Sequence, residues 1–183
     1  MRNITILNFS ARTNGNCAEI ANIIKATYSS TNVCAFLISE VFEPCNGCDY
    51  QCLKPGANCP NITKAQLDLM EQILASDLLY YVIPNYCGVP CANYYAFNER
   101  NVGFFNSDRA LIEKFASLEK RYIMVSNTEG TAFESVPIQQ SRANGGKMLY
   151  LKTSNYAKSS IAGDLMTSSK AKSDLTTFLA EDL

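Results

Sequence analysis

Histidine is absent from the 183 residues of this sequence. Its absence excludes Ser-His and Cys-His nucleophile pairs, histidine metal ligands and the commonest general base. No stretch approaches the roughly 18 consecutive apolar residues of a membrane-spanning helix, and the first apolar run passes into a polar loop too early for a signal peptide. We therefore expect a cytoplasmic protein without membrane contacts, whose chemistry depends on a cofactor, on thiols, or on Tyr, Asp, Glu and Lys.

Charge is also scarce: charged residues make up 18% of the chain, and the formal net charge is -1. Lysine and arginine are scattered without a run, so the electrostatic footprint of a nucleic-acid-binding protein is missing. Hydrophobic residues account for 47% of the chain, which is typical of a globular protein. A chain of this length is suited to one α/β domain.

Strand-like and helix-like segments alternate along the chain. Strands are predicted at residues 4–9, 33–39, 78–83, 122–126 and 148–153, and helices at 17–28, 62–76, 91–100, 108–118 and 170–183. The 78–83 segment has no polar alternation, as expected for a central parallel strand covered on both faces. The pattern predicts a three-layer α/β sandwich of the flavodoxin-like type, with five parallel strands in the order 2-1-3-4-5. Ligands of such sheets bind beyond the carboxyl ends of the strands.

The loop after the first strand carries polar groups at the start of a predicted helix. It contains Ser10, Arg12, Asn14, Asn16 and Cys17. Free N–H groups and the helix dipole favour an anion there, and the loop is suited to a phosphomonoester. A simple turn with a helix cap would also account for these residues.

The loop after the third strand lies at the switch in strand order. It reads Pro84-Asn85-Tyr86-Cys87-Gly88 and offers backbone polar groups and an aromatic face to a flat ring. Ordinary packing of the tyrosine is the alternative interpretation.

These two loops resemble those of the NADPH-dependent FMN reductase and multimeric flavodoxin family. That family has Ser-x-Arg-x-x-Gly-Asn followed by Thr or Ser, and this chain departs from it only at Cys17, where a weak thiol donor replaces a hydroxyl. The family's Pro-x-Tyr corresponds to Pro84 to Tyr86, and its Phe-x-Asp-Arg corresponds to residues 97–100, with Glu99 replacing Asp.

The resemblance covers roughly the first 130 residues and implies a single FMN-binding domain over residues 1–183. It assigns the FMN phosphate to the first loop and the flavin ring to the second. It also places Asn127 and Gly130, in the loop after the fourth strand, on the other side of the ring. Glu99 and Arg100 are expected to fix a helix end and a subunit interface, and a homodimer or homotetramer is implied.

Four cysteines gather within fifteen residues: Cys45, Cys48, Cys52 and Cys59. Four thiolates at this spacing suit a [4Fe-4S] cluster or a zinc ion. Iron-sulfur members of the family have Cys-x2-Cys-x2-Cys, whereas the second gap here is one residue longer. Other members keep similar cysteines without a cluster, so a loop of free thiols is the third interpretation.

The resemblance implies an FMN-dependent oxidoreductase that takes hydride from NAD(P)H and reduces a quinone, a flavin or another small acceptor. The cofactor supplies the redox chemistry, which explains how a chain without histidine can be an enzyme. The alternatives are a flavodoxin-like or iron-sulfur electron carrier without a nicotinamide site, and a binding module without flavin.

Overall fold

The computed structural model describes residues 2–45, 47–54, 59–106, 108–129 and 146–182. The strands are β1 (Asn3–Asn8), β2 (Asn32–Leu37), β3 (Leu78–Tyr86), β4 (Val89–Pro90), β5 (Glu119–Ser126) and β6 (Lys147–Lys152). The helices are α1 (Asn16–Thr27), α2 (Lys64–Leu74), α3 (Ala92–Phe105), α4 (Arg109–Ser117) and α6 (Ser169–Ala180). Short 3-10 helices are η1 (Ile38–Glu40), η2 (Gln51–Leu53), η3 (Thr153–Tyr156) and η4 (Leu165–Thr167).

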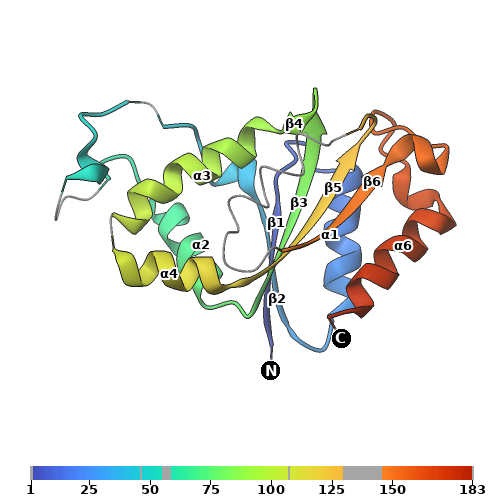
Figure 1. Ribbon diagram of the computed structural model, residues 1–183, viewed down its shortest axis with the longest axis horizontal. Helices are drawn as coiled ribbons and strands as arrows, with labels where there is room; N and C mark the ends of the chain where they lie inside the picture. Colours follow the sequence, from blue (N-terminus) through green and yellow to red (C-terminus); the bar gives the residue numbers. More distant parts are fainter. Residues whose placement is uncertain (1, 46, 55–58, 107, 130–145, 183) are drawn as a thin grey trace.

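Five strands form a parallel sheet in the order β2-β1-β3-β5-β6, as Figure 1 shows. Counted in chain order, this is the predicted arrangement 2-1-3-4-5, and the predicted fold class is confirmed. β3 lies in the centre of the sheet, and its residues 78–84 are all buried. The uninterrupted apolar run of this strand is explained by helices that cover both of its faces.

Helices α1 and α6 cover one face of the sheet, and α2, α3 and α4 cover the other (Figure 1). Each side has its own apolar core, around Ile6 and Leu175 on the first face and around Phe9 and Phe97 on the second. The start of α2 is set by a local sequence signal. Thr63 and Gln66 form a capping box there, in which each side chain accepts a hydrogen bond from the other's backbone N–H.

The segment after the central strand is a β-hairpin, where the sequence predicted a loop over residues 84–90. β3 continues to Tyr86, which pairs antiparallel with Val89 of β4. The turn between them consists of Cys87 and Gly88, with φ of +54° and +82°. Positive φ at both residues is the geometry of a two-residue turn that matches strand twist. The sequence lacked the usual Asn-Gly signal, so the hairpin was not predicted.

β5 begins at Glu119, three residues before the predicted start, because it pairs with β3 from Leu78 on, and the two cations at its beginning are buried with partners. Lys120 Nζ donates to the carbonyl oxygens of Phe115 at 2.6 Å and Leu118 at 3.1 Å. Arg121 Nε donates to both carboxylate oxygens of Asp182 at 2.9 Å. Buried charges need such partners, and sequence periodicity does not reveal them.

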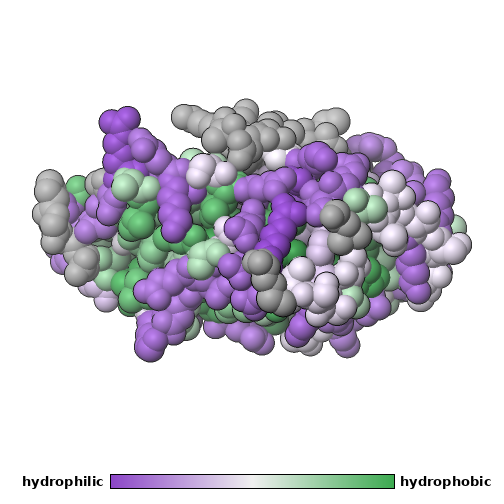
Figure 2. All heavy atoms as spheres, turned by 90° about the horizontal axis from the view of Figure 1, so that it is seen from below, coloured by the Kyte–Doolittle hydropathy of each residue, from purple (hydrophilic) through white to green (hydrophobic). Residues whose placement is uncertain are grey.

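Figure 2 views the molecule from the amino ends of the strands, where hydrophilic residues cover much of the face and hydrophobic ones show between them. In the ranges that the structure describes, no helix is long and apolar enough to cross a membrane.

Candidate functional site

A cavity lies at the carboxyl edge of the sheet, between the ends of β1, β3 and β5. It combines the two loops that the sequence singled out, although they are about seventy residues apart. No acidic side chain lines it, and Arg12 is its one cation among the described residues. Its lining residues are Ser10, Arg12, Gly15, Asn16, Cys17, Pro84, Asn85, Tyr86, Val125, Ser160 and Ile161.

The first loop is shaped by side-chain bonds to its own backbone. Ser10 N–H donates to Asn8 Oδ1 at 3.0 Å, and Arg12 N–H donates to Ser10 Oγ at 3.1 Å. The loop ends at Gly15, the N-cap of α1, which has no side chain to bond the helix N–H groups. The first turn of α1 therefore presents free N–H groups beside a cavity without acidic residues, an arrangement that favours an anion.

Asn16 is held in a fixed orientation at the start of α1. Its Oδ1 accepts from Leu165 N–H at 2.9 Å, so its Nδ2 donor is turned the other way. The side chain is buried, lines the cavity, and has no partner for Nδ2 among the described residues. A buried amide donor without an acceptor is costly, which points to an acceptor supplied by a ligand.

Asn85 has the complementary arrangement at the end of β3. Its Nδ2 donates to Ser126 Oγ at 2.7 Å, which links the ends of β3 and β5. Its Oδ1 is buried, without a partner in the described part of the chain, and the residue lines the cavity. Two residues that line the cavity, one at the start of α1 and one at the end of β3, thus have a buried donor and a buried acceptor without partners among the described residues.

Arg12 connects the first loop to a segment near the end of the chain. Its Nη1 donates to the carbonyl oxygens of Ser160 and Ile161, both at 3.1 Å. Its guanidinium also lies against Gly15 and Gly163, where an added Cβ would come within 3.4 Å of it. Arg12 therefore ties the segment after β6 over the first loop, a role that the sequence did not predict.

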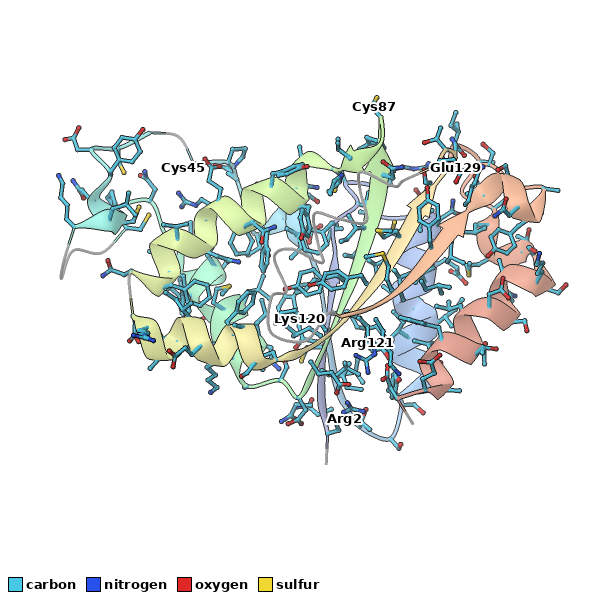
Figure 3. The ribbon with its side chains drawn as sticks, viewed as in Figure 1. Arg2, Cys45, Cys87, Lys120, Arg121 and Glu129 are labelled. Carbon is cyan, nitrogen blue, oxygen red and sulfur yellow. The ribbon has the colours of Figure 1, made fainter. Side chains whose placement is uncertain are left out.

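The remaining predicted residues of the two loops differ in their placement. Cys17 is buried, and burial raises the pKa of its thiol to about 12. Tyr86 lies at the mouth of the cavity with 54% of its surface exposed. Cys87 and Gly88 form the hairpin tip and do not line the cavity; Figure 3 shows Cys87 at the outer end of the hairpin.

Two further predicted residues lie beside the cavity instead of in its lining. Asn14 lines an adjoining hollow together with Glu19 and Lys172. Asn127 connects loops: its Oδ1 accepts from Thr153 Oγ1 at 2.6 Å and from Ser160 N–H at 2.9 Å. Gly130 lies outside the described residues.

The sequence interpretation missed the contribution of the segment after β6, from which Ser160 and Ile161 reach the cavity. A signal was available, because this segment follows the fifth parallel strand and must leave the sheet at the same carboxyl edge. Val125 also lines the cavity and was not predicted, because it belongs to the last residues of β5 and not to the loop that follows the strand.

The four clustered cysteines lie on the α2–α3–α4 side of the sheet, and Figure 3 shows Cys45 there, far from Cys87. All are free thiols. In the part of the chain that the structure describes, no three residues of the His, Cys, Asp and Glu types are grouped closely enough to hold a metal ion. The predicted iron-sulfur or zinc site therefore receives no support from the geometry.

No family model and no curated protein matches this sequence. Solved structures do resemble it. A putative quinone reductase from Klebsiella pneumoniae has a TM-score of 0.65 at 10% identity, over 97% of this chain and 84% of that one. FerB, a flavoenzyme NAD(P)H:(acceptor) oxidoreductase from Paracoccus denitrificans, has a TM-score of 0.62 at 10% identity, over 98% and 96%.

An NADH:FMN oxidoreductase, solved in its apo form, has a TM-score of 0.54 at 11% identity, over 99% of this chain and 90% of that one. At such low identity, likeness in structure establishes the fold and leaves the function to be argued from the site.

Proposed function

We propose that this flavodoxin-like chain is an FMN-dependent oxidoreductase that accepts hydride from NAD(P)H and passes electrons to a quinone, a flavin or another small acceptor. The observation that carries the proposal is that two residues lining one cavity each have a buried amide atom without a partner in the described part of the chain, Asn16 Nδ2 and Asn85 Oδ1. FMN offers an anionic phosphate at one end, and hydroxyl and imide donors elsewhere, so it can satisfy both.

The phosphate would bind at the start of α1. There the free N–H groups of the first helical turn, the Ser10 hydroxyl and Asn16 Nδ2 are all donors, and no acidic residue lines the cavity. Arg12 adds positive charge while it holds the Ser160 and Ile161 carbonyl groups. The thiol of Cys17, with its raised pKa, stays neutral and does not repel an anion.

The flavin ring would extend from the mouth of the cavity. The cavity measures about 170 Å³, below the range of roughly 300–1,000 Å³ that encloses whole small molecules. Tyr86 stands at this mouth and offers a ring face, while Asn85 presents its free acceptor beside it. One face of the ring would then stay open to a nicotinamide or an acceptor in turn.

Bound FMN would supply the redox chemistry itself, by accepting a hydride and releasing electrons singly or in pairs. The chain's own residues bind and orient: Asn16 and the first turn of α1 hold the phosphate end, and Asn85 fixes the other. The described lining offers no side chain suited to proton transfer at neutral pH. Protons would therefore be exchanged with solvent at the open face.

The names of structural neighbours support this reading, since they include an NADH:FMN oxidoreductase and a flavoenzyme NAD(P)H:(acceptor) oxidoreductase. The proposal includes a homodimer or homotetramer in the cytoplasm. Tyr86, Val89 and Tyr95 leave 54%, 43% and 42% of their surfaces exposed near the hairpin, an apolar area that a second copy would cover.

The experiment is an anaerobic spectral titration. Purified protein is mixed with FMN, and then NADPH and NADH are added in turn, with light scattering on the same sample for the oligomeric state. A bound-flavin spectrum bleached by a pyridine nucleotide supports the oxidoreductase. A bound flavin that stays oxidised indicates the electron carrier instead, and the absence of a bound spectrum overturns the proposal.

A further inference from the structure

Both ends of the cysteine-rich loop are fixed to consecutive residues of α3. Cys45 N–H donates to Glu99 Oε2 at 3.0 Å at one end. At the other end, the Arg100 guanidinium donates to Asn61 O and, at 3.2 Å, to Gln66 Oε1. Arg100 is only 7% exposed, so its two bonds are sheltered from water. The sequence assigned Glu99 and Arg100 to a helix end and a subunit interface, but both residues lie inside α3, where they hold the loop along the helix.

One turn further along α3, a glycine makes room for two of the thiols. A Cβ added at Gly103 would lie 2.9 Å from Cys59 Cβ, 3.0 Å from Cys59 Sγ and 3.9 Å from Cys52 Cβ. Glycine costs about 1 kcal/mol relative to alanine inside a helix. Its backbone does not adopt the left-handed conformation here, so space for the neighbouring side chains is what the glycine provides.

The two cysteines are therefore neighbours in space. Their β-carbons lie 2.9 Å and 3.9 Å from one point beside Gly103, so they are no farther apart than the sum of these distances; the β-carbons of a disulfide are about 3.5–4.5 Å apart. We propose that Cys52 and Cys59 form a reversible dithiol–disulfide pair, a modification site separate from the cavity at the carboxyl edge. For the bond to form, the loop over α3 has to bring the two β-carbons within the disulfide distance.

The oxidant that we name is hydrogen peroxide. One thiolate attacks peroxide to give a sulfenic acid and release hydroxide, which is protonated to water. The second thiol then displaces a further water as the S–S bond forms. Two thiols lose two electrons and two protons, and one peroxide becomes two waters. A dithiol reductant reverses the step by thiol–disulfide exchange.

Acid–base chemistry gives the reaction its pH dependence. Partial burial, and after it the nearby thiols of Cys48 and Cys59, raise the pKa of the Cys52 thiol. The thiolate is the reactive form, so Cys52 reacts slowly at neutral pH. Pair formation should accelerate as the pH rises.

Chymotryptic mapping tests the proposal. The native protein is treated with one equivalent of hydrogen peroxide, alkylated, and cleaved after Phe42, Tyr50, Leu53 and Leu67. This cleavage separates the four cysteines into three peptides: 43–50, 51–53 and 54–67. We expect peptides 51–53 and 54–67 to be linked and to separate on reduction, while 43–50 carries alkyl groups on both of its thiols.

Matched variants make the test specific. C52S and C59S should each abolish the link, whereas C45S and C48S should leave it in place. Gly103→Ala should slow its formation, because the added Cβ displaces Cys59. Preferential linking inside peptide 43–50, linking of peptide 43–50 to either of the others, or no link in native protein overturns the proposal. None of these results depends on flavin.

Discussion

Asn85 donates through Nδ2 to Ser126 Oγ at 2.7 Å and thereby fixes its own Oδ1, buried and unpaired, in the wall of the cavity. The bond joins the ends of two neighbouring strands, β3 and β5. It decides which end of the amide is available to a ligand. The bond to Ser126 therefore leaves Asn85 with a hydrogen-bond acceptor that is free within the described part of the chain.

Asn85→Leu tests the contribution of this amide to ligand binding and to stability. The variant removes the unpaired acceptor and also the bond from Nδ2 to Ser126 Oγ, so the ligand-free protein should lose about 1 kcal/mol in the free energy of unfolding. FMN affinity should fall by about tenfold, the effect of one lost hydrogen bond. Flavin fluorescence quenching measures the affinity and thermal unfolding measures the stability. Equal FMN affinity in the two proteins would remove Asn85 from the site.

Asn16→Asp tests the phosphate position with a nearly isosteric change. The carboxylate still accepts from Leu165 N–H, but the unpaired donor becomes a negative oxygen facing the cavity. Repulsion should weaken FMN binding by on the order of 100-fold. Riboflavin, which lacks the phosphate, should lose far less. Parallel titrations with both flavins check this, and an equal loss for the two would place the phosphate elsewhere.

Arg12→Met should release the segment after β6. The variant loses both bonds to the Ser160 and Ile161 carbonyl groups, so trypsin should cut after Lys158 several times faster than in the original protein. Arg109→Met is the control, since Arg109 is an exposed surface residue paired with Glu113. Timed digestion followed by mass spectrometry gives the rates. Unchanged cleavage would show that Arg12 does not secure the segment.

Asp182→Asn should destabilise the fold strongly. Arg121 and Asp182 are both nearly inaccessible to solvent, with side chains 6% and 1% exposed, and the variant leaves the buried guanidinium with Glu119 as its remaining carboxylate partner among the described residues. We expect a loss of about 2 kcal/mol in the free energy of unfolding, the effect of weakening charge-assisted hydrogen bonds. Glu181→Gln breaks an exposed pair with Lys147 and should cost less than about 1 kcal/mol. Urea unfolding of both variants provides the comparison, and similar losses would contradict it.

Burial of Cys17 predicts a loss of stability at alkaline pH. Its pKa rises from 9.0 to about 12 on folding, so the folded state holds its proton where the unfolded state has released it. The stabilisation is complete below pH 9 and is lost as the pH rises towards 12. Between pH 9 and 10.5, the original protein should lose about 1.5 kcal/mol more than Cys17→Ala. Urea unfolding at both pH values measures this difference, and parallel pH profiles would refute it.

Much of the fold could be predicted from the sequence because its signals are local. The apolar run that became β3 and the alternation of strand and helix were sufficient for the sheet order. The start of β5 was predicted three residues late, because a partner of its first residues comes from far along the chain. Arg121 is buried with Asp182, which lies 61 positions away in the sequence.

Most of the cavity lining was also predictable. Ser10, Asn16 and Asn85 were identified because polar residues after parallel strands meet at one edge. The contribution of Ser160 and Ile161, and the role of Arg12 in holding them, could not be read from local pattern, since these bonds join residues nearly 150 positions apart.

The sequence by itself determined the fold class, the absence of histidine chemistry, and which two loops would face each other, because periodicity and turn chemistry act over a few residues. Only the tertiary structure decided which end of each asparagine amide is left unpaired, and that Cys52 and Cys59 share the space beside Gly103. Those outcomes depend on hydrogen bonds and contacts between segments far apart in the chain. These segments come into contact only when the helices pack against the sheet.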